Sequence, residues 1–234
     1  MILERLAGLI VSIQPEAESV LNTPATVALL ARCAVANGAT GVRIEGPERI
    51  AAVRRAVDVP IVGLLKRSYP GFAPYITPTA ADVRAVAAAG AEVIAFDATA
   101  RARPDGSDVT ELIAAIHACG AVAMADCATG TEARNAAAAG AEIVATTLCG
   151  YTQETRGHAL PALDVLREAA ATGAFAILEG GVADPDQVRG AYAAGASAVV
   201  IGTALTNLDA RIRAFAEIPA RQKSAPENRL PRTV

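Results

Sequence analysis

A repeat of helix, glycine and strand constrains the fold of this chain more than any other feature. Runs of helix-forming residues end in glycine and lead into short apolar segments, as in AAAGAEVIAFD, AAAGAEIVATT and AAGASAVVIG. The repeated glycines are Gly38, Gly90, Gly120, Gly140, Gly173 and Gly195. Helices often end at a residue in the left-handed conformation, which glycine adopts without a Cβ penalty. The segments that follow are apolar on both faces, as parallel strands covered by helices must be.

This pattern predicts six strands over the 234 residues, and two further apolar runs, at 9–13 and 60–65, bring the number to eight. They span residues 9–13, 41–44, 60–65, 93–96, 122–125, 143–146, 176–178 and 198–201, with seven helices between them and one after the last. Such alternation predicts an α/β fold of the (β/α)8 TIM barrel type. An open doubly wound sheet is the alternative, but no GxGxxG motif follows the first strand. We expect residues 1–218 to form one barrel domain and residues 219–234 a partly disordered tail.

Composition argues against several classes of partner. The net charge is −3, and aromatic residues make up 3% of the chain without any tryptophan, so we expect no nucleic-acid partner. No uninterrupted apolar run reaches 18 residues, so we expect no membrane segment. The four cysteines form no CxxC pair and the two histidines lack metal-ligand spacing. These observations predict reduced thiols, a cytoplasmic location and no metal site.

Polar side chains follow the apolar segments at nearly every predicted strand end. In barrels of this class the catalytic residues come from the carboxyl ends of the strands. The polar residues at these positions are Gln14, Arg43, Glu45, Lys66, Asp97, Asp126, Thr146, Thr147 and Glu179. They predict a ring of charged and polar groups around one mouth of the barrel.

Lys66 ends the apolar run of residues 60–65 and is the leading candidate for chemistry in this ring. Burial at the mouth and a nearby cation such as Arg43 both favour the neutral amine. A neutral lysine serves as a general base or as a Schiff-base nucleophile. The structural alternative is an ion pair between Lys66 and either Asp97 or Asp126.

The last two predicted strands end in glycine-containing turns. Gly180 and Gly181 follow the seventh strand, and Gly202 and Thr203 follow the eighth. Glycine lets a phosphate approach the backbone, and barrels often bind phosphate after these two strands. The turns therefore predict a phosphate site, although tight turns alone would also account for the glycines.

Several segments together resemble the N-acetylmannosamine-6-phosphate 2-epimerase family, enzymes of sialic acid catabolism in bacteria. They are VSIQ, GVRIEG, GLLKRSYP, YITPT, MADCAT, ATTLCGYT, LEGG and VVIGTALTN, and the likeness runs over about residues 10–215. The resemblance implies a barrel of the ribulose-phosphate-binding type that interconverts N-acetylmannosamine 6-phosphate and N-acetylglucosamine 6-phosphate. It also implies that no metal or organic cofactor is needed and that the protein is a homodimer.

The resemblance also implies roles for individual residues. It places the catalytic lysine at Lys66 and the catalytic glutamate at Glu179, with Gln14, Arg43 and Asp126 as groups that orient the substrate. Thr147 and Tyr151 lie in the segment ATTLCGYT, and we expect them to contact the substrate too. Three positions depart from the family pattern, which usually has arginine where this chain has Gly181 and Asn207, and serine where it has Cys149.

A mechanism follows from these expectations. Lys66 would remove the C2 proton of the open-chain sugar, and Arg43 would donate to the C1 oxygen of the resulting enediolate. Glu179 would assist ring opening or act as the acid on the opposite face. Tyr69, Tyr75 and Tyr151 would exclude water. The alternatives are a Schiff-base aldolase or lyase using Lys66, a sugar-phosphate-binding barrel without activity, and an epimerase of an aminosugar without phosphate.

Overall fold

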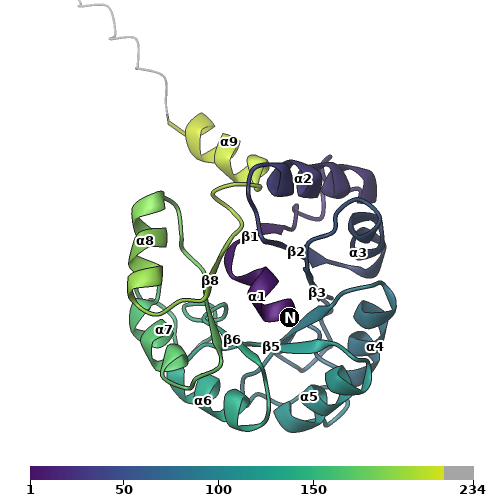
Figure 1. Ribbon diagram of the computed structural model, residues 1–234, viewed down its shortest axis with the longest axis vertical. Helices are drawn as coiled ribbons and strands as arrows, with labels where there is room; N and C mark the ends of the chain where they lie inside the picture. Colours follow the sequence, from purple (N-terminus) through teal and green to yellow (C-terminus); the bar gives the residue numbers. More distant parts are fainter. Residues whose placement is uncertain (219–234) are drawn as a thin grey trace, which may run out of the picture.

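The computed structural model describes residues 1–218 and contains a closed barrel of eight parallel strands, shown in Figure 1. The strands are β1 (Gly8–Ile13), β2 (Gly41–Glu45), β3 (Ile61–Leu64), β4 (Val93–Asp97), β5 (Val122–Asp126), β6 (Ile143–Ala145), β7 (Phe175–Glu179) and β8 (Ala198–Ile201). Each strand pairs with the next, and β8 closes the barrel on β1. The predicted TIM barrel is confirmed, and each strand bound lies within about one residue of its expected position.

Helices surround the barrel and follow the predicted alternation. They are α1 (Ile2–Leu6), α2 (Pro24–Ala36), α3 (Pro47–Arg54), α4 (Ala80–Ala88), α5 (Val109–Ala118), α6 (Gly130–Ala138), α7 (Leu163–Ala170), α8 (Pro185–Ala193) and α9 (Leu208–Ala216). The six repeat glycines all have positive φ, between 73° and 105°. The left-handed helix ends that the repeat predicted are therefore present.

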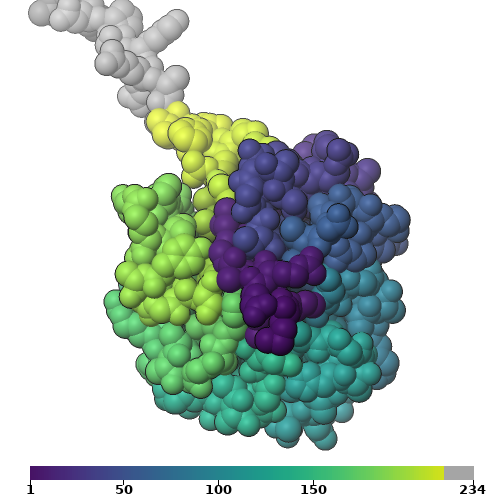
Figure 2. Space-filling view, viewed as in Figure 1, coloured from purple at the N-terminus to yellow at the C-terminus, as the bar shows by residue number. Residues whose placement is uncertain are grey.

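The short helix α1 was not expected from the sequence. It precedes β1, and its Leu6 is fully buried among the side chains that fill the barrel. A Cβ on Gly41, at the start of β2, would lie 2.6 Å from Leu6. Figure 2 shows α1 lying over the centre of this face of the molecule. Because α1 closes the amino end of the barrel, a ligand site must use the carboxyl end.

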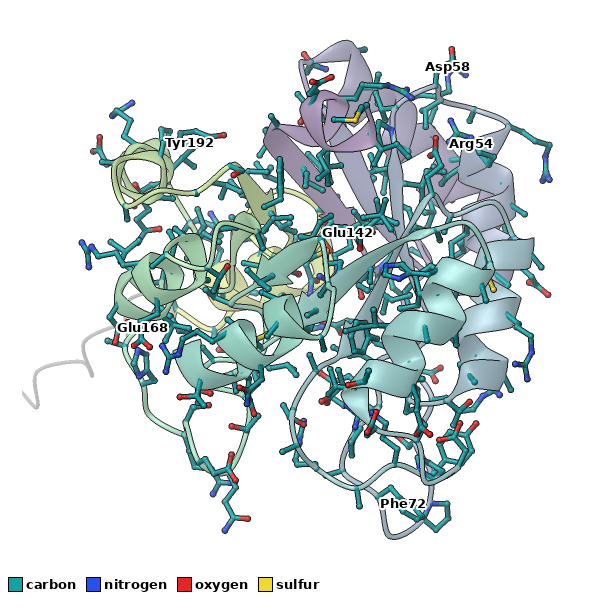
Figure 3. All side chains as sticks on the ribbon, turned by 60° about the horizontal axis from the view of Figure 1, so that its bottom comes forward. Arg54, Asp58, Phe72, Glu142, Glu168 and Tyr192 are labelled. Atoms are coloured by element: carbon teal, nitrogen blue, oxygen red, sulfur yellow. The ribbon has the colours of Figure 1, made fainter. Side chains whose placement is uncertain are left out.

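Side chains along each strand alternate between the barrel interior and the surrounding helices. The interior holds Ile10, Val62, Val93, Met124, Ile143, Ile177 and Val200, among others. The outer layer, between strands and helices, includes Val42, Ile44, Phe96, Ala125 and Leu178. The same alternation directs Arg43, Asp126 and Glu179 inward at the carboxyl end of the barrel. Asp58 and Phe72, which precede and follow β3, lie at opposite ends of the molecule in Figure 3.

Helix α9 differs from the other helices in having no buried residue. It projects from the ring of α2 to α8 in Figure 1 and carries exposed apolar side chains, namely Leu208, Ile212 and Phe215. The expected tail, residues 219–234, lies outside the described residues. Within residues 1–218, no helix has the length and apolar character needed to cross a membrane.

Candidate active site

A cavity of about 880 Å³ opens at the carboxyl ends of the strands. Ten of the eleven predicted site residues line it: Gln14, Arg43, Lys66, Thr147, Tyr151, Glu179, Gly180, Gly181, Gly202 and Thr203. The eleventh, Asp126, is fully buried and contacts the lining residues Arg43 and Thr147. The structure therefore brings the predicted residues together at one mouth.

Arg43 joins three strands at the floor of this cavity. Its Nη1 and Nη2 donate to the two carboxylate oxygens of Asp126, over 3.0 and 2.6 Å. Nη1 also donates to Oε2 of Glu179, over 2.5 Å. The arginine thus reaches from β2 to β5 and β7. Although burial disfavours the charged form, the carboxylates of Asp126 and Glu179 raise the pKa of Arg43, so the guanidinium stays charged.

Glu179 is positioned through both its backbone and its side chain. Its N–H donates to Oγ1 of Thr146 over 3.0 Å, and that hydroxyl donates back to the carbonyl of Glu179 over 2.8 Å. Thr147 Oγ1 lies 2.6 Å from Asp126 Oδ1 and 3.2 Å from Glu179 Oε2. Burial raises the pKa of Glu179 to about 7, with Asp126 adding to the rise and Arg43 opposing it. This carboxyl group therefore changes protonation near neutral pH.

Lys66 has a free side-chain amine within the described residues, where it makes no ion pair and no side-chain hydrogen bond. Asp97 pairs instead with Arg101, and Asp126 pairs with Arg43. The alternative of a structural ion pair between Lys66 and either aspartate is therefore wrong. Lys66 is reached by solvent through the open cavity. The protein around it still removes much of the hydration of the ammonium, and this desolvation, followed by the charge of Arg43, lowers the pKa of Lys66.

The backbone around Lys66 is held by the loop that follows β3. The Lys66 N–H donates to Glu45 Oε1 over 3.3 Å, and Lys66 forms an antiparallel bridge with Ile76. Thr77 is fully buried with φ of 42°, which is unusual for a β-branched residue. Its Oγ1 accepts from the Leu65 N–H over 3.1 Å and donates to the Ala95 carbonyl over 2.7 Å. Sequence reasoning missed Thr77, because nothing in the local sequence indicates its backbone conformation.

The three tyrosines expected at the mouth do not all lie there. Tyr75 and Tyr151 line the cavity. Tyr69 does not, and its hydroxyl donates to Asp82 Oδ2 over 3.3 Å. Asp82 is fully buried in the first turn of α4 and also pairs with Arg67 over 2.8 Å. The expected role of Tyr69 in excluding water is wrong, because the buried carboxylate of Asp82 holds this tyrosine outside the cavity.

The glycine-containing turns form the other end of the cavity. Gly180 and Gly181 have φ of 106° and 76°. A Cβ at Gly181 would lie 2.5 Å from the Cβ of Leu160. After the neighbouring strand β8, the backbone is held by Thr206, whose Oγ1 donates to the Ser12 carbonyl over 2.6 Å. The turns thus expose main chain to the cavity, as a phosphate site requires.

Gln14 offers one further polar group to a ligand. Its Nε2 donates to Ser12 Oγ over 2.8 Å, and its buried Oε1 has no partner among the described residues. The two histidines lie elsewhere, with His117 beside Glu142 and His158 beside Asp164. Within residues 1–218, no group of three or more His, Cys, Asp or Glu residues is arranged to hold a metal ion.

Comparisons with known proteins agree with this geometry. Residues 27–220 match the family model described as "Putative N-acetylmannosamine-6-phosphate epimerase". Proteins called "Putative N-acetylmannosamine-6-phosphate 2-epimerase" from Synechococcus elongatus and Thermosynechococcus vestitus are 44% and 46% identical, over 89% of this chain and 91% of each relative.

A solved structure supports the same assignment. The N-acetylmannosamine-6-phosphate 2-epimerase from Clostridium perfringens superposes with a TM-score of 0.89 at 33% identity, covering 94% of this chain and 96% of that one. A 3-hexulose-6-phosphate synthase, at 20% identity and a TM-score of 0.60, shares the fold alone. The matched segments and the relatives together show that this chain belongs to the N-acetylmannosamine-6-phosphate epimerase family.

Proposed function

We propose that this protein interconverts N-acetylmannosamine 6-phosphate and N-acetylglucosamine 6-phosphate by moving the proton on C2. The names of the relatives support the substrate pair. The observation that carries the chemistry is Lys66, a lysine in the cavity whose amine has no carboxylate partner among the described residues and whose pKa is lowered by burial. Residues 1–218 would act as one domain.

The first step is removal of the C2 proton from the open-chain sugar. The neutral amine of Lys66 takes the proton, the C2–H electron pair becomes the C1–C2 double bond, and the carbonyl pair moves onto the C1 oxygen. Arg43 is the proposed donor to this oxygen. Three of its five N–H groups bind Asp126 and Glu179, which leaves one N–H on Nη2 and one on Nε. A fixed donor of this kind stabilises an enediolate without reorganising.

The second step returns a proton to the opposite face of C2. Glu179 is the proposed acid, because its pKa of about 7 leaves part of the population protonated at neutral pH. The C1–C2 double bond supplies the electrons for the new C–H bond, and the C1 carbonyl re-forms. The same carboxyl group would assist opening and closing of the sugar ring. Asp126 and Thr147 hold Glu179 and Arg43 in place.

The rest of the cavity would bind the remainder of the sugar. Gln14 Oε1 is the proposed acceptor for a hydroxyl or the acetamido N–H, and Tyr75 and Tyr151 would exclude water. The phosphate would lie at the turns of Gly180, Gly181, Gly202 and Thr203. Because a sugar phosphate is charged and does not cross a bilayer unaided, we also propose a cytoplasmic location.

We further propose that the protein is a homodimer that uses α9. Leu208, Ile212 and Phe215 recur at helical spacing and are 50%, 61% and 68% exposed. A second copy would cover this apolar stripe. Light scattering during gel filtration should give twice the chain mass for the wild type and a monomer for Ile212→Glu. Phe72→Glu, in an exposed loop at the carboxyl end of the barrel, is the control and should stay dimeric. A monomeric wild type would refute this assembly.

Proton NMR in D₂O tests the reaction directly. With N-acetylmannosamine 6-phosphate, the wild type should lose the C2 proton signal while the gluco epimer appears. Lys66→Ala should do neither. Lys66→Arg keeps the positive charge but has no neutral form at pH 7, so its activity should also fall by at least about 100-fold. If the wild type leaves the C2 proton in place, the proposal is wrong. Borohydride trapping of an adduct on Lys66 would instead indicate a Schiff-base enzyme.

A further inference from the structure

The charged side chains that line the cavity are not equally available to a ligand. The lining cations are Arg43, Arg49, Lys66 and Arg211. Arg43 is bound by Asp126 and Glu179, and Arg49 is bound by Glu45. The Arg211 side chain makes no ion pair and no hydrogen bond within the described residues. It is therefore the one lining guanidinium, in this part of the chain, whose donors are all free.

Arg211 lines the cavity from α9, the helix that follows β8. It belongs to the first turn of α9, four residues after Asn207, so the two side chains share a face of the helix. Gly202, Thr203, Thr206 and Asn207, which lead into α9, line the same cavity. The guanidinium lies 5.6 Å from the ring centroid of Phe215, a cation–π contact that limits its motion while leaving its N–H groups free.

The charges around Arg211 leave this end of the cavity able to accept an anion. Glu16 is the lining carboxylate nearby, and it is already bound by Arg213 and by Asn207 Nδ2, the latter over 3.4 Å. The hydrogen bond from Arg213 lowers the pKa of Glu16, so this group stays ionised and paired at neutral pH. Asp209 adds one more negative charge on α9. The turns at Gly180 and Gly202 contribute only neutral main-chain donors.

We propose that Arg211 binds the phosphate of the substrate and makes the enzyme select phosphorylated over free aminosugar. This inference rests on the proposed function. A phosphate dianion needs a compensating charge, and Lys66 and Arg43 are committed to the sugar's reacting carbons. A guanidinium is suited to this task because two of its N–H groups bind two phosphate oxygens at once.

Steady-state kinetics with N-acetylmannosamine 6-phosphate test the assignment. Arg211→Gln should raise KM about tenfold or more, with kcat nearly unchanged, because the lost contact is made equally in the ground state and the transition state. Competitive inhibition by inorganic phosphate should be weaker in Arg211→Gln by a similar factor. The KM of Arg211→Lys should lie between the values for the wild type and Arg211→Gln. Arg189→Gln, which removes an exposed surface arginine paired with Asp186 on α8, is the matched control and should behave as the wild type.

Two results separate this inference from the proposed function. If Arg211→Gln keeps the wild-type KM and the wild-type affinity for inorganic phosphate, Arg211 does not bind the phosphate. If the wild type has no epimerase activity, the function is wrong, and calorimetric titration of inorganic phosphate into the wild type and Arg211→Gln still decides the role of Arg211. Since α9 has no buried residue, the variant should fold, and circular dichroism checks this.

Discussion

Arg43 and Asp126 form a bidentate ion pair inside the barrel, with side chains that are only 2% and 0% exposed. Two charges removed from water are tolerated only when each satisfies the other. Asp126 has a second effect, because its negative charge adds to the burial that raises the pKa of Glu179. The pair therefore supports both the shape of the site and the protonation of the proposed acid.

The first prediction is that Asp126→Asn destabilises the protein. The variant leaves the Arg43 guanidinium buried with Glu179 as its remaining anionic partner. We expect the free energy of unfolding to fall by about 3 kcal/mol, the lower end of the range for a broken buried pair, since the amide oxygen still accepts one bond. Urea unfolding followed by circular dichroism measures this change.

Asp186→Asn is the matched control for this substitution. Asp186 pairs with Arg189 on the surface of α8, where the two side chains are 85% and 72% exposed. Exposed pairs contribute between about 0 and 1 kcal/mol, so this variant should unfold nearly as the wild type does. Equal stability losses in the two variants would contradict the view that the Arg43–Asp126 pair matters because it is buried.

The second prediction concerns pH. Burial raises the pKa of Glu179 to about 7 in the folded protein, whereas the unperturbed value is 4.5. Between these values the folded state binds more protons than the unfolded state, so stability falls as pH rises. The contribution is fully present below pH 4.5 and is lost as pH rises through about 7. It amounts to on the order of 3 kcal/mol.

Glu179→Gln isolates this contribution. The free energy of unfolding should be measured in urea at several pH values between 4.5 and 8 for the wild type and the variant. The wild type should lose more stability across this window than Glu179→Gln, whose amide does not titrate. Parallel curves would show that Glu179 ionises normally in the folded protein and would remove the basis for its role as an acid near neutral pH.

The third prediction is that the hydroxyl of Thr77 positions Lys66. Thr77→Val keeps the shape but leaves the Leu65 N–H and the Ala95 carbonyl without this partner. Each unsatisfied buried group costs about 1–3 kcal/mol, so we expect a stability loss of about 2 kcal/mol. Because Leu65 precedes Lys66 directly, kcat should fall while KM changes little.

Thr77→Ser tests the hydroxyl against the methyl group. The serine keeps the Oγ that accepts from Leu65 and donates to Ala95, so kcat should stay near the wild-type value. The kinetics of both variants with N-acetylmannosamine 6-phosphate give the comparison. If Thr77→Val and Thr77→Ser have the same kcat, the hydroxyl does not position the lysine.

Much of this site could be predicted because the sequence shows where each strand ends, and the site residues lie at the strand ends. The glycine-terminated repeat located six strands, and two apolar runs gave the first and the third. Alternation along the strands directs Arg43, Asp126 and Glu179 into the same mouth. The pairing of Arg43 with both carboxylates was not predictable, since it depends on how β2, β5 and β7 face one another across the closed barrel. Sequence reasoning considered Asp126 as a partner for Lys66, and the structure pairs it with Arg43.

Loops and short elements account for what the sequence did not reveal. Helix α1 has five residues, too few to show a helical period. Thr77 depends on a backbone conformation that no local pattern indicates, and Tyr69 turns to Asp82 because that carboxylate is buried within reach. The sequence did not indicate Arg211, because the family pattern has its arginine at position 207, one helical turn earlier, where this chain has asparagine.

The last prediction concerns Gly181, the other position where the resemblance led us to expect arginine. Its φ is 76°, and a Cβ there would lie 2.5 Å from Leu160 Cβ and 3.3 Å from the Leu160 carbonyl carbon. Gly173 has a similar φ of 81° but nothing within 4 Å of its Cβ position. Gly173→Ala should therefore lower the free energy of unfolding by only about 1 kcal/mol, the cost of holding an alanine in the left-handed conformation. Gly181→Ala should lower the free energy of unfolding by about 3 kcal/mol, because overpacking against Leu160 adds to the cost of the left-handed conformation. Urea unfolding of both variants gives the difference, and equal losses would mean that the Leu160 segment moves aside freely and leaves room for a side chain at this turn.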